Sequence, residues 1–115
     1  TEPRRPSSQM RVLLDECVPI QVKSHLGGYE VRTVGRMGWA GKKNGELLKL
    51  AATWFDVFVT VDRSLKHQQN LAGRRLGVVT LVAHSNEIEV LRPLIPRLRH
   101  ALRKVKPGQV IRVSG

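Results

Sequence analysis

The chain has 115 residues, the length of one ordinary domain with one hydrophobic core. A hydrophobic content of 41% is enough for a folded protein and excludes general disorder. The net charge of +11 and the pI near 11.1 favour an anionic partner, most often a nucleic acid. A basic protein that pairs with an acidic protein is the alternative interpretation.

The cysteine content and the absence of long apolar runs point to a cytoplasmic protein. The single cysteine, Cys17, excludes an internal disulfide, and we expect it to be a small core residue rather than a nucleophile. No apolar run approaches the ~18–20 residues of a membrane span, and no signal-peptide pattern precedes Met10. Residues 1–9 are predicted to be a flexible leader, either native or added for expression, before a single domain at residues 10–115.

The first third of the chain predicts two strands separated by a helix. Arg11–Leu14 is a short apolar run typical of a buried strand. A turn with Pro19 at an early helical position leads into a helix, which the pair Gly27 and Gly28 ends. The second strand is expected at Glu30–Val34, where the residues alternate and include β-branched side chains.

A glycine-rich loop and a second helix lead to the third strand. The loop, Gly35–Gly45, holds four glycines and is long for so small a domain, which indicates a functional role. Asn44 is the expected N-cap of a helix that starts at Gly45 or Glu46 and has apolar residues at helical spacing. The third strand, Val57–Val61, is followed directly by a carboxylate, Asp62.

The last part of the chain continues the alternation. Residues 62–70 are polar and predicted to carry a short helix, and Gly77–Val82 is an apolar run that predicts the fourth strand. A long helix is expected to reach Lys104, with Ser85 or Asn86 as its cap and with first turns made irregular by two prolines.

These segments and a fifth strand at Gln109–Val113 give the order βαβαβαβαβ. Such alternation implies parallel strands joined by right-handed crossovers, with helices on both faces. We therefore predict an α/β fold: a three-layer α/β/α sandwich with a central, mainly parallel sheet of four to five strands.

Two of the predicted core strands end in carboxylates, Asp15 and Asp62. Parallel strands bring their carboxyl ends to one rim of the sheet, where open α/β sheets bind ligands. Glu46 lies in the first turn of a helix that enters from the same rim, at the edge of its apolar stripe. Helix capping by the aspartates, and a favourable helix-dipole contact of Glu46, are the alternative roles. Other acids fall where surface residues are expected: Glu2, Glu30, Asp56, Glu87 and Glu89.

If the first and third strands are neighbours, the three carboxylates repel one another, and a divalent cation removes the conflict. Mg²⁺ takes oxygen ligands and is typically held by one or two carboxylates together with a substrate phosphate. In phosphodiester cleavage such an ion activates water and stabilises the charged transition state. The pattern therefore predicts a metal-dependent nuclease.

Basic and polar residues near this rim are candidates for nucleic-acid contact. They are Lys42, Lys43, Asn44, Arg63, Lys66 and Trp39. The cations would contact phosphate, which positions a substrate without reading its sequence, and a solvated charged surface is the alternative. Trp39 is a candidate for stacking on an unpaired base, although such a residue more often packs a loop onto the core.

Three segments in this order resemble a known family. Leu13–Glu16, Gly38–Glu46 and Val59–Asp62 are similar to the small PIN-like domain proteins of bacteria, and the resemblance covers roughly residues 10–113. It implies the α/β/α fold with the third strand beside the first, and a ribonuclease that depends on Mg²⁺ or Mn²⁺. It also implies the toxin role of many PIN proteins in toxin–antitoxin pairs, with Asp15, Glu46 and Asp62 as the catalytic, metal-binding acids.

The chain departs from the family at one position of the acidic site. PIN nucleases usually carry a fourth acid soon after the Thr-x-Asp segment, but residues 63–66 are Arg-Ser-Leu-Lys, and Glu16 is the candidate replacement as a metal ligand. The departure leaves an alternative: a catalytically weak or inactive PIN-like module that binds nucleic acid or an antitoxin. The basic stripe of the last helix would track a nucleic acid or meet an acidic antitoxin. A homodimer is expected only by analogy with PIN toxins.

Overall fold

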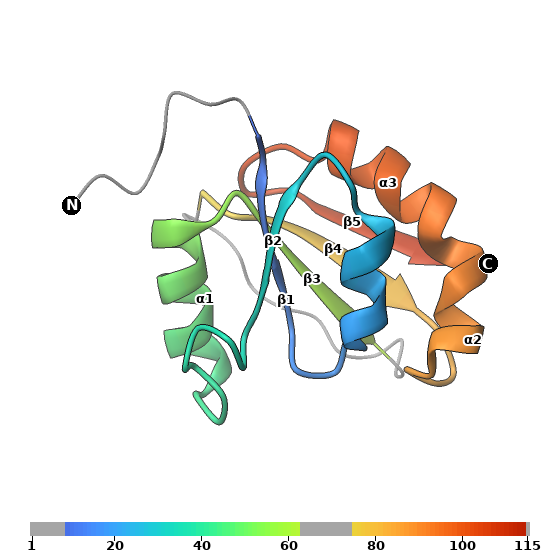
Figure 1. Ribbon diagram of the computed structural model, residues 1–115. Coiled ribbons are helices and arrows are strands. Elements are labelled where there is room, and N and C mark those ends of the chain that lie inside the picture. The colour runs from blue at the N-terminus through green and yellow to red at the C-terminus, as the bar shows by residue number, and fades with distance from the viewer. Residues whose placement is uncertain (1–8, 63–74, 115) are drawn as a thin grey trace.

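The computed structural model describes residues 9–62 and 75–114, without the side chains of Asn44 and Asp62. In these residues five strands form one sheet in the order β2-β1-β3-β4-β5 (Figure 1). The strands are β1 (Arg11–Leu14), β2 (Glu30–Thr33), β3 (Val57–Asp62), β4 (Gly77–Val82) and β5 (Val110–Ser114). Every neighbouring pair is parallel, which confirms the predicted parallel sheet and the adjacency of the first and third strands.

Helices cover both faces of this sheet, which confirms the three-layer α/β/α sandwich (Figure 1). They are the 3₁₀ helices η1 (Ile20–His25) and η2 (Arg92–Leu94) and the α-helices α1 (Asn44–Trp54), α2 (Ile88–Leu91) and α3 (Ile95–Lys104). The helix α1 lies on one face, and η1, α2 and α3 lie on the other. Within the described ranges, no helix is long and apolar enough to cross a membrane.

Alternation along the strands divides the core between the two faces. On the α1 face, Leu13 of β1 and Phe58 of β3 pack with Leu47 and Ala51 of the helix. The residues on either side of Leu13 point the opposite way, and they form the second core with η1 and α3. Both faces are therefore apolar, as expected for a parallel sheet covered by helices on both sides.

Two helix boundaries differ from the sequence expectation. Lys43, not Asn44, is the N-cap of α1, because the Lys43 carbonyl already accepts the first helical hydrogen bond, from Leu47 N–H at 2.8 Å. Glu87, rather than Ser85 or Asn86, is the N-cap of α2. The Ser85 hydroxyl still accepts a hydrogen bond from the Glu87 N–H at 3.0 Å, and this bond stabilises the turn just before the helix.

The irregular start of the last helix is confirmed. In place of one long helix, the chain forms α2, the 3₁₀ turn η2 and then α3. Pro93 and Pro96 lie at the beginnings of η2 and α3, where a residue without an N–H is tolerated. The short helix predicted within residues 62–70, and almost all of the leader at residues 1–9, lie outside the described residues.

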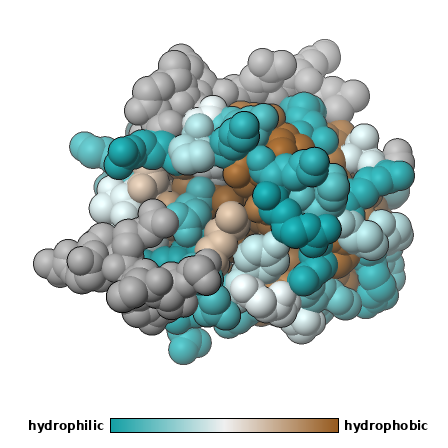
Figure 2. All heavy atoms as spheres, turned by 90° about the horizontal axis from the view of Figure 1, so that it is seen from above, coloured by the Kyte–Doolittle hydropathy of each residue, from teal (hydrophilic) through white to brown (hydrophobic). Residues whose placement is uncertain are grey.

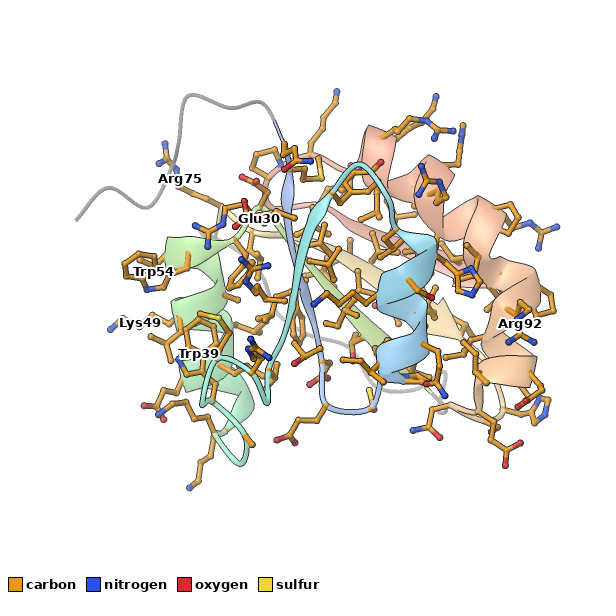
Figure 3. The ribbon with its side chains drawn as sticks, in the orientation of Figure 1. Glu30, Trp39, Lys49, Trp54, Arg75 and Arg92 are labelled. Atoms are coloured by element: carbon orange, nitrogen blue, oxygen red, sulfur yellow. The ribbon has the colours of Figure 1, made fainter. Side chains whose placement is uncertain are left out.

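At the amino ends of the strands, two acids hold β1 in place. The Arg11 backbone N–H donates to Asp56 Oδ2 at 2.8 Å, and the Arg11 Nε lies 3.6 Å from Glu30 Oε2. The Arg11 guanidinium also lies over the Phe55 ring, 5.1 Å from its centroid. Glu30, labelled in Figure 3, is therefore part of the framework of the sheet rather than an ordinary surface residue.

Gly77, at the start of β4, lies where the end of α3 returns to the sheet. A Cβ on this residue would stand 2.9 Å from Val105 Cγ2 and 3.2 Å from the Lys106 carbonyl oxygen. We expect Gly77→Ala to lower the free energy of unfolding by about 1–3 kcal/mol, measured by urea denaturation, because stiff neighbours must move. Gly45→Ala is the matched control: nothing lies within 4 Å of its Cβ, so it should cost nothing. Equal stability of the two variants would contradict this packing argument.

Candidate functional site

The order of the strands in the sheet reverses direction between β1 and β3. The chain runs from β1 outward to β2 and then returns past β1 to β3, so its direction across the sheet changes between β1 and β3. Doubly wound parallel sheets bind ligands at such a point, outside the carboxyl ends of the strands. Asp15 directly follows β1 and Asp62 is the last residue of β3, so both belong to this position in the fold.

The Asp15 carboxylate is half-buried and accepts hydrogen bonds at both of its oxygens. Its Oδ2 accepts from the Thr60 hydroxyl at 2.7 Å, and its Oδ1 accepts from the Glu16 backbone N–H at 2.8 Å. The Asp15 backbone N–H donates to the Val59 carbonyl at 2.9 Å, which continues the β1–β3 pairing past the end of the strand. Asp15 is thus attached to β3 through both its backbone N–H and its side chain.

Cys17 lies beside this pair. Its Sγ is 3.5 Å from the Thr60 hydroxyl, and it accepts from the Val61 backbone N–H at 3.4 Å and donates to Asp15 Oδ2 at 3.7 Å. Burial raises the pKa of the Cys17 thiol above its ordinary value of 9.0, and the Asp15 negative charge adds to that shift, against opposing hydrogen bonds from Thr60 and Val61. The thiol is therefore protonated near neutral pH, which agrees with a packing role rather than a nucleophilic one.

Glu16 connects the turn after β1 to the glycine-rich loop. Its Oε2 accepts a hydrogen bond from the Gly41 backbone N–H at 3.0 Å, and Glu16 is itself exposed. Gly41 has a φ of 84°, in the region that favours glycine, so the loop presents this N–H through a turn that other residues rarely adopt. In this structure Glu16 therefore holds the loop next to Asp15.

Glu46 lies in the first turn of α1, as predicted, and forms an ion pair on the surface. Its Oε2 is 3.3 Å from the Lys42 ammonium, one helical turn earlier, and its side chain is 61% exposed. Exposed pairs of this kind contribute at most about 1 kcal/mol, so Glu46 can exchange Lys42 for another cation at little cost.

Among the described side chains, no three of the His, Cys, Asp and Glu residues form a group that could hold a metal ion. The side chain of Asp62 is outside that set, so the site of Asp15, Glu46 and Asp62 stays a prediction. The donor chemistry of Asp15 fits a hard cation, because its Oδ1 accepts one hydrogen bond, from the Glu16 N–H, and keeps a second lone pair for a ligand.

The residues predicted to contact nucleic acid differ in how exposed they are. Trp39 is half-buried and meets the Phe55 ring edge-on, with centroids 6.0 Å apart and planes at 86°. Figure 3 shows it beside α1, so the ring packs the loop onto the core, the alternative role considered above. Lys43 is exposed and Lys42 is half-buried. Asn44 is described only by its backbone, and Arg63 and Lys66 lie outside the described residues, so their contacts with nucleic acid stay predictions.

Sequence reasoning missed a polar row across the sheet. Thr60 of β3 is paired in register with Thr80 of β4, and Thr80 with Arg112 of β5, while Asp15, just after β1, stands beside Thr60. Thr80 is buried, with 7% exposure. The signal was a threonine at the same place in two apolar strands, FVTV and VVTL, where an aliphatic residue would otherwise be expected.

The hydrogen bond from Thr60 to Asp15 can be tested by its effect on stability. We expect Thr60→Val to lower the free energy of unfolding by about 1–2 kcal/mol, because a hydroxyl that donates to a carboxylate is replaced by a methyl group. Thr60→Ser keeps the hydroxyl and should retain most of the stability. Chemical denaturation of both variants checks this, and equal losses would show that the methyl packing, not the hydrogen bond, is the cause.

The raised pKa of Cys17 predicts slow alkylation. The thiolate is the reactive form, so the folded protein should react with iodoacetamide more slowly than the urea-unfolded chain, and the rate should continue to rise above pH 9.0. The rate is measured against pH in both states by mass spectrometry. A folded-state rate near neutral pH that equals or exceeds the unfolded one would contradict the assignment.

Comparison of the chain with family models, curated proteins and solved structures gave no match. Any functional statement about this chain therefore depends on its own residues and on the geometry of the β1–β3 rim.

Proposed function

We propose that the protein is a metal-dependent endoribonuclease that hydrolyses RNA phosphodiester bonds at the carboxyl rim of β1 and β3. In this proposal it acts in the cytoplasm as the toxin of a toxin–antitoxin pair and is held inactive by an acidic antitoxin. The observation that carries the proposal is the parallel pairing of β1 with β3, because it brings two strands that end in aspartates side by side.

Register and helix position support the acidic site. Leu14 is paired with Val59, so Asp15 stands level with Thr60, and Asp62 is two positions further along β3. Alternate positions of a strand belong to the same face of the sheet, so position 62 belongs to the face of position 60, which is also the face that α1 covers. Glu46, in the first turn of α1, enters from the same rim.

In this function Asp15, Glu46 and Asp62 would hold Mg²⁺ or Mn²⁺, which supplies activation of water and charge stabilisation for phosphodiester hydrolysis. Other residues at the rim would position the metal-binding acids, the glycine-rich loop and the substrate. Thr60 orients the Asp15 carboxylate, and Glu16 holds the glycine-rich loop against the rim. Lys42 and Lys43 on that loop would attract the phosphate backbone of the substrate.

A second candidate is a PIN-like module that binds RNA or an antitoxin with little or no catalysis. One specific observation favours it. Glu16, the candidate for the missing fourth acid, already accepts the Gly41 N–H and is exposed. A site with fewer carboxylates holds divalent ions more weakly, so binding can persist where cleavage fails.

The two candidates are separated by incubating the pure protein with mixed RNA, with and without Mg²⁺ or Mn²⁺. We expect cleavage only with metal, and a loss of roughly 100-fold or more for Asp15→Asn and for Asp62→Asn, because several kcal/mol of charge stabilisation disappear. Gel analysis of the fragments measures the rates.

Glu89→Gln is the matched control, since this exposed acid in the first turn of α2 is outside the proposed site. It should cleave like the unaltered protein. Cleavage that survives in both aspartate variants, or that needs no metal, would reject the nuclease proposal. RNA binding without cleavage would establish the second candidate.

A further inference from the structure

The outward surface of α2–η2–α3 carries a concentration of positive charge. Between Glu89 and the end of the chain there is no aspartate or glutamate. We define the α3 face by the exposed basic residues Arg92, Arg97, His100, Arg103 and Lys104. Along the helix, Arg97 and Lys104 are about 10 Å apart at the usual rise per residue, so the charges form a stripe rather than a point.

Two arginine side chains, Arg99 and Arg97 of the face itself, attach this helix to neighbouring segments. The Arg99 Nη1 donates to the carbonyls of His25 at 3.0 Å and Gly27 at 3.2 Å, and its guanidinium lies 5.7 Å from the centroid of the Tyr29 ring. Arg97 donates to the Ser114 carbonyl at the end of β5. The helix that carries the α3 face is therefore attached to the segment after η1 and to the end of β5.

Its charges are not neutralised within the described part of the chain. The ion pairs there join Arg11 and Arg32 to Glu30, and Lys42 to Glu46, and none involves a cation of the α3 face. In the view from above, most of the surface drawn on the right-hand side of the molecule is hydrophilic, with hydrophobic residues showing between the hydrophilic ones (Figure 2). The face thus presents exposed, uncompensated positive charge.

The face also lacks the apolar centre that a protein partner needs. Of the described residues, the large apolar side chains that are exposed are Ile20 and Val110, and neither belongs to α3. Protein interfaces depend on a few buried aromatic or aliphatic anchors inside a polar rim. A phosphate backbone needs only positioned cations, so the chemistry of this face fits a polyanion better than a folded acidic protein.

The location of α3 connects this face with the rim. The strand β4 ends at the same rim as β1 and β3, and the chain then enters α2, η2 and α3, which return toward the start of β5. Arg92 therefore lies nearer the rim than Lys104 in the path of the chain. We propose that the α3 face binds the phosphate backbone of single-stranded RNA that continues beyond the β1–β3 rim. The choice of RNA rests on the proposed function.

The test measures binding without catalysis. A fluorescein-labelled single-stranded RNA is titrated with the 115-residue protein in EDTA, at a series of KCl concentrations, and anisotropy gives the Kd. Arg103→Gln with Lys104→Gln removes two charges of the α3 face. The matched control, Lys49→Gln with Arg75→Gln, removes two exposed charges from other surfaces, and Figure 3 shows Lys49 and Arg75 on the opposite side of the molecule from Arg92.

We expect the α3 pair to weaken binding roughly tenfold at low salt and to make the slope of log Kd against log salt shallower by about 1.4, the value for two lost phosphate contacts on a single strand. The control pair should change the Kd less than about threefold. Because Arg103 and Lys104 also complement the helix dipole, thermal melting confirms folding, and Arg92→Gln, outside that last turn, should weaken binding in the same direction.

Equal effects of the two pairs would overturn the α3 face as the binding surface while leaving the nuclease proposal intact. RNA binding through α3 without any metal-dependent cleavage would support the α3 face as the binding surface and reject the nuclease proposal. Absence of RNA binding at low salt, or capture of polyglutamate in preference to RNA, would reject the proposal and point to an acidic protein partner instead.

Discussion

The parallel pairing of β1 with β3 is the constraint on which the rest of the structure depends. Val12, Leu13 and Leu14 are paired in order with Val57, Phe58 and Val59, and all of these side chains are buried. A shift of one residue would exchange the two faces of β1 and bury the wrong side chains under α1 and η1, so the register is strongly determined. That register also decides which residues follow the strands at the rim, and it places Asp15 beside Thr60.

Beyond the last paired residues of β1 and β3, hydrogen bonds that involve side chains connect the segments at the rim. The Thr60 hydroxyl and the Glu16 N–H occupy one lone pair on each oxygen of Asp15, and the Glu16 side chain binds the glycine-rich loop. Each group therefore positions the next, from β3 to β1 and from β1 to the loop. This arrangement would preorganise the proposed site, because the carboxylate orientation is already fixed by hydrogen bonds.

Much of the fold could be predicted because the two signals that determine it are local. One signal is an apolar run of strand length, such as Gly77–Val82, whose predicted bounds match those of β4. The other is the alternation of such runs with helical patterns along the chain. The N-cap of α1 could not be predicted, since Lys43 becomes the boundary through backbone hydrogen bonding rather than through its side chain. Thr60 and Glu16 were likewise missed as positioning residues. Their partners, Asp15 and Gly41, are 45 and 25 residues away, and only the folded chain brings them together.

The distribution of charge connects the two proposals physically. The acids at the rim are few, and three cations predicted to contact substrate, Lys43, Arg63 and Lys66, adjoin them in sequence. A second group of exposed cations lies on the α3 face, at the other side of the sheet from α1. In the proposed function, a polyanion drawn only to the rim would be repelled by its carboxylates until a metal is bound. Cations on the neighbouring helix would hold the same strand without competing for those carboxylates, so attraction of the RNA would be separate from the proposed chemistry at the rim.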